Sequence, residues 1–175
     1  MEKDLRYPIG RFDKNIEVTE EIRSTFFNTL ENLPSLLRKE VENLTEEQLN
    51  THYRDGGWTI KQVVHHLPDS HLNSYVRFKL ALTEENPIIK TYKENLWAEL
   101  KDSYDTPIST SLDLLDSLHQ RWIILLRSLT DEQFNRTFKH AEWGDITLNT
   151  TLALYAWHSK HHLAHITELK KRMNW

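Results

Sequence analysis

The chain contains no cysteine, and this absence excludes disulfide bonds, a thiolate metal site and a cysteine nucleophile. Glycine and proline are scarce, with four and five residues, and few runs of β-branched residues alternate, which indicates an all-α fold.

No apolar run approaches the roughly 18–20 residues that span a bilayer, and the charged first residues form no apolar signal segment. Lysine and arginine form no block that would favour nucleic acid. We therefore expect a cytoplasmic protein that acts on a small molecule and binds neither membrane nor nucleic acid.

The remaining composition is typical of an ordinary globular protein. The 175 residues are 38% apolar and 27% charged, and the formal net charge is −4. A chain of this length can bury a substantial hydrophobic core. We expect a single domain that covers residues 1–175.

The segment 155–166 is rich in histidine and carries the clearest chemical signal. It holds four of the ten histidines, namely His158, His161, His162 and His165. It has no glycine or proline, and apolar residues recur every three to four positions, so it is predicted to be helical. Residues four apart lie on the same face of a helix. The pairs His158/His162 and His161/His165 therefore each have a spacing that can bind one metal ion.

The apolar periodicity favours the first of these pairs. The predicted core stripe of this helix consists of Leu148, Leu152, Tyr155, Ser159, His162, Ile166 and Leu169. His162 lies within the stripe and His158 at its edge, whereas His161 is predicted to face solvent. His165 is expected to be an alternative ligand or to support the ligands.

Capping signals and apolar periodicity divide the rest of the chain into helices. Thr19 is a predicted N-cap, and Thr45 and Thr59 each begin a capping box that ends in glutamine. The predicted elements are an extended arm over 1–17, long helices over about 19–41, 59–82, 107–129 and 147–173, and short helices after 45 and over 92–103. Pro34 and Pro68 fall inside two of the long helices and should bend them.

Two short phrases in the chain are near copies. Residues 44–50 read Leu-Thr-Glu-Glu-Gln-Leu-Asn, and residues 129–135 read Leu-Thr-Asp-Glu-Gln-Phe-Asn. Each precedes a tryptophan and then a helix that bears histidines. This repetition favours two similar helical hairpins packed into a four-helix bundle.

A catalytic metal site usually has three protein ligands and an open position. The helix over 59–82 corresponds to the histidine-rich helix in the two-hairpin plan and offers His65, His66 and His71. His71 lies in the middle of the apolar stripe, His66 lies on a polar flank, and His65 points away. Spacing alone leaves His66 and His71 as equal candidates for the third ligand.

Several phrases closely resemble the YfiT branch of the DinB/YfiT superfamily. They include Tyr53-Arg-Asp-Gly-Gly-Trp-Thr-Ile-Lys-Gln-Val-Val-His-His-Leu67 and Trp157-His-Ser-Lys-His-His-Leu-Ala-His-Ile-Thr167. The resemblance implies a four-helix bundle with short extra helices and an extended N-terminal arm, assembled as a homodimer. It also implies one divalent metal ion per chain, zinc or nickel, held by His66, His158 and His162. Pro68 departs from the helix former that the family pattern would lead us to expect.

The same resemblance implies either a metal-dependent hydrolase or an S-transferase that uses bacillithiol or a similar thiol. The alternative is a non-catalytic helical module with a structural metal or none. No general base is assigned from the sequence.

A row of polar residues adds a candidate for binding the cosubstrate. His66, Ser70, Asn73 and Arg77 follow one another at helical spacing. Arg77 would lie about 16 Å from His66 along the helix axis, within reach of the anionic malate end of bacillithiol. The alternative is that Arg77 is solvated or pairs with a nearby glutamate such as Glu84 or Glu85.

Overall fold

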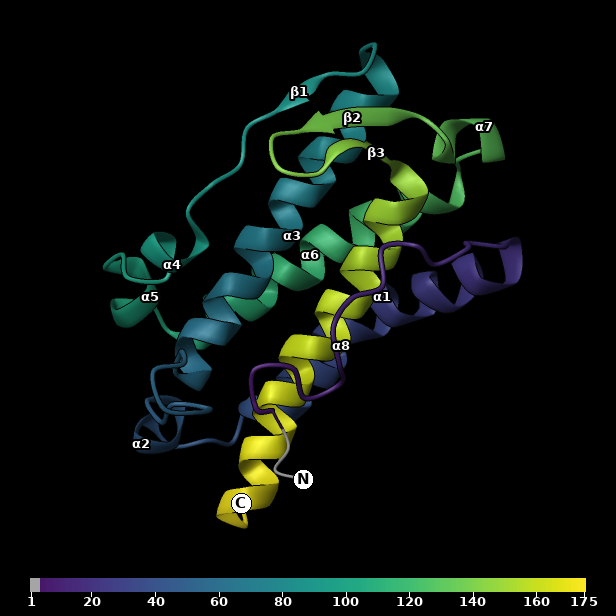
Figure 1. Cartoon of the computed structure of the whole chain (residues 1–175). Helices are drawn as coiled ribbons and strands as arrows, with labels where there is room; N and C mark the ends of the chain where they lie inside the picture. Colours follow the sequence, from purple (N-terminus) through teal and green to yellow (C-terminus); the bar gives the residue numbers. More distant parts are fainter. Residues whose placement is uncertain (1–3) are drawn as a thin grey trace.

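The computed structural model describes residues 4–175, and four long helices dominate it (Figure 1). They are α1 (Glu20–Val41), α3 (Ile60–Thr83), α6 (Ile108–Arg127) and α8 (Leu148–Met173). Their bounds agree closely with the predicted helices. The expected four-helix bundle is confirmed.

Shorter elements connect the long helices. Four single-turn helices are α2 (Glu46–Leu49), α4 (Glu94–Trp97), α5 (Asp102–Asp105) and α7 (Asp131–Phe134). The helix expected over 92–103 is therefore wrong as one element, because α4 and α5 are separate turns. The strands β1 (Ile88–Ile89), β2 (Thr137–His140) and β3 (Gly144–Thr147) form a small sheet that an all-α prediction did not include.

The sheet has the order β1-β2-β3. Strand β1 pairs in parallel with β2, with Ile88 opposite Lys139, and β2 pairs with β3 in an antiparallel hairpin. Strand β2 contacts α3, and β3 runs directly into α8. The sheet therefore lies across one end of both helices (Figure 1).

Local hydrogen bonds start the helices where the sequence predicts. Reciprocal side-chain and backbone bonds form capping boxes at Thr45/Gln48, Thr59/Gln62 and Thr130/Gln133. Thr19 caps α1 and Thr147 caps α8 by accepting a backbone N–H. Each such cap contributes about 1 kcal/mol to helix stability, so the start of α3 and of α8 is well defined.

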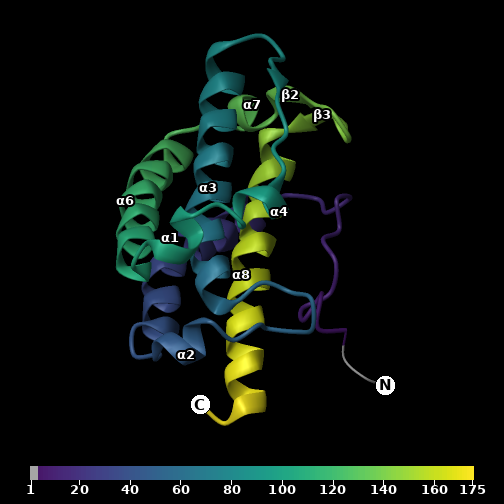
Figure 2. The same cartoon turned by 90° about the vertical axis from the view of Figure 1, so that its left-hand side faces the viewer.

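The packing order of the long helices differs from the predicted pair of hairpins. Helix α1 packs against α6 and α8, and α3 packs against the same two helices, so α1 and α3 occupy opposite corners (Figures 1 and 2). The hairpin prediction is wrong because the connections 42–59 and 128–147 are long enough to cross the bundle instead of joining neighbours. As a result α3 and α8, which carry the candidate ligands, lie side by side.

A polar layer divides the hydrophobic core. One buried cluster surrounds Trp122 and Phe78 near the sheet, and the other surrounds Leu37 and Val63 near α2. Between them lie buried polar side chains from α3, α6 and α8, namely His66, Ser70, His71, Ser74, His119, Ser159 and His162. Buried polar groups destabilise a core unless they are paired or bind a ligand, and some of this layer are paired within the protein, as Ser159 is with the carbonyl of Tyr155.

The N-terminal arm runs along α8 (Figures 1 and 2). The indole of Trp157 donates to the carbonyl of Gly10 at 3.3 Å, and Nε2 of His165 lies 3.3 Å from the carbonyl of Arg6. The arm therefore covers the outer side of the histidine-rich part of α8. Within residues 4–175, none of the helices has the length and apolar character needed to cross a membrane.

Candidate metal centre

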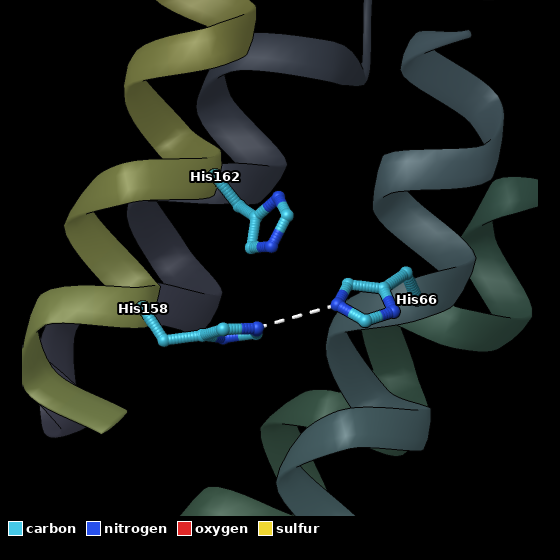
Figure 3. Close-up of side chains that lie close together, drawn as sticks. All are labelled: His66, His158 and His162. Carbon is cyan, nitrogen blue, oxygen red and sulfur yellow. Dashed lines mark hydrogen bonds between the residues drawn. The ribbon is translucent and has the colours of Figure 1, made fainter. Parts of the chain in front are cut away.

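Three histidines from two helices converge in the polar layer. His66 on α3 and His158 and His162 on α8 point toward one another (Figure 3), and one nitrogen of each lies within 4.8 Å of the others. The Nε2 atoms of His66 and His158 are 3.2 Å apart. His66 and His162 are almost fully buried, with 6% and 7% of their surface exposed, and His158 is half-buried. The structure thus brings together the same three histidines that the sequence resemblance implied.

The local structure explains this convergence. His158 and His162 are one turn apart on α8, so their imidazoles share a face. The capping box at Thr59 sets where α3 begins and hence which face carries His66. Trp58, just before that cap, packs its ring 4.6 Å from His66 and 6.1 Å from His162. The indole therefore shields the cluster from one side.

Burial keeps the three imidazoles uncharged. Desolvation, with a smaller contribution from His161, lowers the pKa of His66 from 6.5 to about 3. Desolvation also lowers the pKa of His158 and of His162 well below 6.5, and the neighbouring imidazoles lower both further. A neutral imidazole offers a lone pair to a metal, so the lowered pKa values suit metal ligands.

The donors present fit a divalent cation. Nδ1 of His162 is buried and has no hydrogen-bond partner in the described part of the chain. Three imidazole nitrogens are typical protein ligands of zinc and related metals. Among the described residues, no fourth histidine or carboxylate belongs to the cluster. The arrangement therefore resembles an open, catalytic type of site more than a closed structural one.

The cluster opens on a cleft of about 610 Å³. The cleft is walled by α3, α8, the arm, the loop before α3, the segment 91–95 and the β2–β3 hairpin. Arg77 and Tyr92 both line it. Within the described chain, the Arg77 guanidinium has no hydrogen bond or ion pair at contact distance, although Glu94 of the cleft attracts it electrostatically. The buried Tyr92 hydroxyl lies near Ser70 but makes no hydrogen bond of normal geometry. Two polar groups thus remain available to a bound molecule.

The predicted polar row on α3 is only partly present in the cleft. His66, Ser70 and Arg77 line it, as expected, and neither Glu84 nor Glu85 forms an ion pair with Arg77 in the described chain. Including Asn73 was wrong, because its amide donates to the carbonyl of Asp69 at 2.8 Å and the residue lies outside the cleft lining.

The other candidate histidines take different places. His71, the open alternative to His66, lies outside the cluster and contacts Nδ1 of His158 at 3.2 Å. His65 is buried elsewhere, with Nδ1 2.7 Å from the hydroxyl of Ser111. His165 as an alternative ligand is wrong, because its ring stacks on Tyr53 at 3.9 Å.

The prediction that His161 faces solvent is also wrong. The side chain is only 7% exposed. Its ring packs 4.4 Å from Trp157 and 5.9 Å from Tyr7. The periodicity of α8 could not show this burial, since the covering residue Tyr7 comes from the distant arm.

Two residues with a place near the site were not singled out from the sequence. His119 on α6 is 2% exposed and lies 2.8 Å from His71. Tyr92 comes from an irregular segment without a recognisable motif. The regularly spaced leucines around His119 indicate an apolar core face, so the residue does not stand out in the sequence. A histidine on the apolar face of a helix could nevertheless have been recognised as a candidate for a polar role in the core.

The chain belongs to the DinB superfamily, whose sequence pattern matches residues 29–166 and so includes all three clustered histidines. Proteins of Bacillus cereus strain B4264 and Bacillus thuringiensis subsp. konkukian strain 97-27 are 56% and 55% identical to it over 172 residues. The matched region is 98% of this chain and 99% of each relative. Both relatives carry the name "Putative metal-dependent hydrolase".

Solved structures agree with this membership. YfiT from Bacillus subtilis matches with a TM-score of 0.94 and 54% identity over 98% of each chain. It is described as "a probable metal-dependent hydrolase with an unusual four-helix bundle topology". The four-helix bundle protein TT2238 matches with a TM-score of 0.59 and 18% identity over 83% of this chain, which shows the fold alone.

Proposed function

We propose that this chain is a metal-dependent enzyme in which His66, His158 and His162 hold one divalent cation, zinc or nickel, beside the cleft. The observation that carries the proposal is the convergence of three uncharged imidazoles, two of them buried and that of His158 half-buried, without a fourth protein ligand in the described chain. Because neutral ligands leave the charge of the cation uncompensated, a bound cation supplies Lewis-acid activation of a water or a small thiol.

Hydrolysis is the reaction that the names of the close relatives support. The chain contributes a partly enclosed cleft, in which Trp58 and the N-terminal arm limit the access of bulk water. Tyr92 offers a hydroxyl that can donate to a polar group of the substrate. These residues bind and orient the substrate next to the histidine cluster.

Thiol transfer is a second reaction that a specific observation favours. Arg77 presents a guanidinium without an ion pair at contact distance to the cleft, about 16 Å from His66 along α3. A planar guanidinium pairs well with carboxylates, so it suits the malate group of bacillithiol or the anionic end of a similar thiol. The thiol has to come from outside, because the chain has no cysteine.

The two reactions can be separated with one set of proteins. Chelator-treated protein is reloaded with zinc or nickel and assayed for hydrolysis of p-nitrophenyl esters and for conjugation of bacillithiol to monochlorobimane, in which sulfur displaces chloride. Activity should appear only in the metal-loaded wild type and be lost in His162→Ala. Full activity in the chelator-treated protein would overturn the proposal, and metal binding with neither activity would favour the non-catalytic alternative.

A further inference from the structure

A continuous line of hydrogen bonds runs from the candidate metal ligand His158 through the whole bundle. Nδ1 of His158 lies 3.2 Å from Nε2 of His71, and Nδ1 of His71 lies 2.8 Å from Nε2 of His119. Nδ1 of His119 then lies 2.6 Å from the carbonyl oxygen of Leu30. The line passes through α8, α3, α6 and α1, with His71 fully buried and His119 2% exposed.

The final acceptor is available because of a proline. In an α-helix the carbonyl of Leu30 would accept the N–H of the residue four positions later. That residue is Pro34, which lies inside α1 and has no N–H. Nδ1 of His119 donates to this carbonyl instead. Pro34 therefore leaves open the acceptor at which the line of hydrogen bonds ends.

The direction of every bond follows from this end point. A carbonyl oxygen only accepts, so His119 carries its hydrogen on Nδ1. A neutral imidazole has one N–H, which leaves Nε2 of His119 to accept from Nδ1 of His71. By the same reasoning, Nε2 of His71 accepts from Nδ1 of His158. In the described chain none of the three imidazoles donates to a carboxylate.

We propose that His71 and His119 are positioning residues that hold His158 in the tautomer with hydrogen on Nδ1, so that the Nε2 lone pair is offered to the metal. This inference rests on the metal site proposed above. Nε2 is the atom of His158 that faces His66. Because the line ends at a backbone carbonyl inside the bundle, it orients a ligand and does not carry protons to solvent. Partners of this kind in other metal sites alter metal affinity or activity by about 10–100-fold.

Histidine tautomers in the metal-free protein test the proposal directly. Long-range proton–nitrogen NMR of the wild type should show hydrogen on Nδ1 of His158, His71 and His119. Predominant hydrogen on Nε2 of His158 would overturn the proposal. This measurement requires neither a variant nor bound metal, so it decides even if substitutions in the polar layer prevent folding.

Zinc affinity, measured by chelator competition, provides the second test. His119→Leu should raise the zinc dissociation constant 10–100-fold and shift hydrogen of His158 from Nδ1 to Nε2, and His119→Gln should restore part of both. The control His65→Leu removes a buried histidine of α3 that lies outside both the line and the polar layer, and it should leave zinc affinity unchanged. Unchanged affinity in His119→Leu would contradict the proposal. A wild type that has the expected tautomers and binds no zinc would overturn the proposed function alone.

Discussion

The Nε2 atoms of His66 and His158 lie 3.2 Å apart, although 92 positions separate the two residues in the chain. At that distance one nitrogen must donate to the other, or both lone pairs must face a shared cation. Because His158 is bonded through Nδ1 to His71, its Nε2 has a lone pair that can accept in the first case and bind the cation in the second, and Oγ of Ser70 lies 3.5 Å from the same atom. The contact thus joins α3 to α8 at the point where the cleft begins.

Arg77→Ala should raise the KM for an anionic thiol several-fold, because the substitution removes the guanidinium that lines the cleft. Arg77→Lys should have an intermediate effect, since an ammonium lacks the planar fork. Steady-state kinetics together with metal analysis measure both effects. Lys79→Ala, which removes an exposed charge of α3 outside the cleft, is the control and should change neither. Loss of metal in Arg77→Ala, or an unchanged KM, would show that Arg77 is structural.

Asp69 should make stability depend on pH. Burial, and secondarily Asp102, raises the pKa of Asp69 from 3.8 to about 6. The folded chain therefore holds this proton more tightly than the unfolded chain, and stability falls as the pH rises from about 4 to 6. Asp69→Asn should increase the free energy of unfolding at pH 7.5 by about 1 kcal/mol, allowing for partial exposure, and have no effect near pH 3.5.

Urea denaturation at the two pH values measures this difference. Asp55→Asn, an exposed aspartate in the loop before α3, is the control and should change stability little at either pH. An Asp69→Asn variant that is less stable than the wild type at pH 7.5 would contradict the assignment.

Gly57 leaves no room for a side chain in the loop that carries Trp58. A Cβ atom there would lie 2.8 Å from Cγ of Arg54 and 3.1 Å from Cζ of Tyr53. Gly57→Ala should therefore lower the free energy of unfolding by about 1–2 kcal/mol, whereas Asp55→Ala should remain within about 0.5 kcal/mol of the wild type. Chemical denaturation measures both, and equal stability of the two variants would show that the loop adapts freely.

We further propose that the chain forms a homodimer. Trp97, Trp143 and Trp175 are 39%, 46% and 37% exposed, and exposed large aromatic side chains are enriched in interfaces between subunits. Multi-angle light scattering at micromolar concentration should give the mass of two chains. The mass of one chain over that range would refute the dimer.

Short-range chemistry explains what the sequence could predict. The capping boxes at Thr45 and Thr59 join residues only three positions apart, so they can be recognised in the sequence, and both form in the structure. The pairing of His158 with His162 depends only on the period of one helix. Choosing His66 over His71 depended on the family resemblance, because both lie on α3 within one and a half turns.

Long-range packing determines the features that could not be predicted. Strand β1 has two residues and exists because Ile88 pairs with Lys139, far along the chain. His161 is buried because the arm folds over α8, as the contact with Tyr7 shows. The place of His119 depends on the packing of α6 against α1 and α3, which helical periodicity does not describe.

The metal content of purified protein tests the central claim most directly. Elemental analysis should find about one divalent ion per chain in the wild type and none in His162→Ala. His161→Ala is the matched control, because His161 is the adjacent buried histidine in the same cleft and lies outside the three-histidine cluster. This control should retain the metal. Stoichiometric metal in His162→Ala, or its loss from His161→Ala alone, would contradict the assignment of His66, His158 and His162 as the ligands.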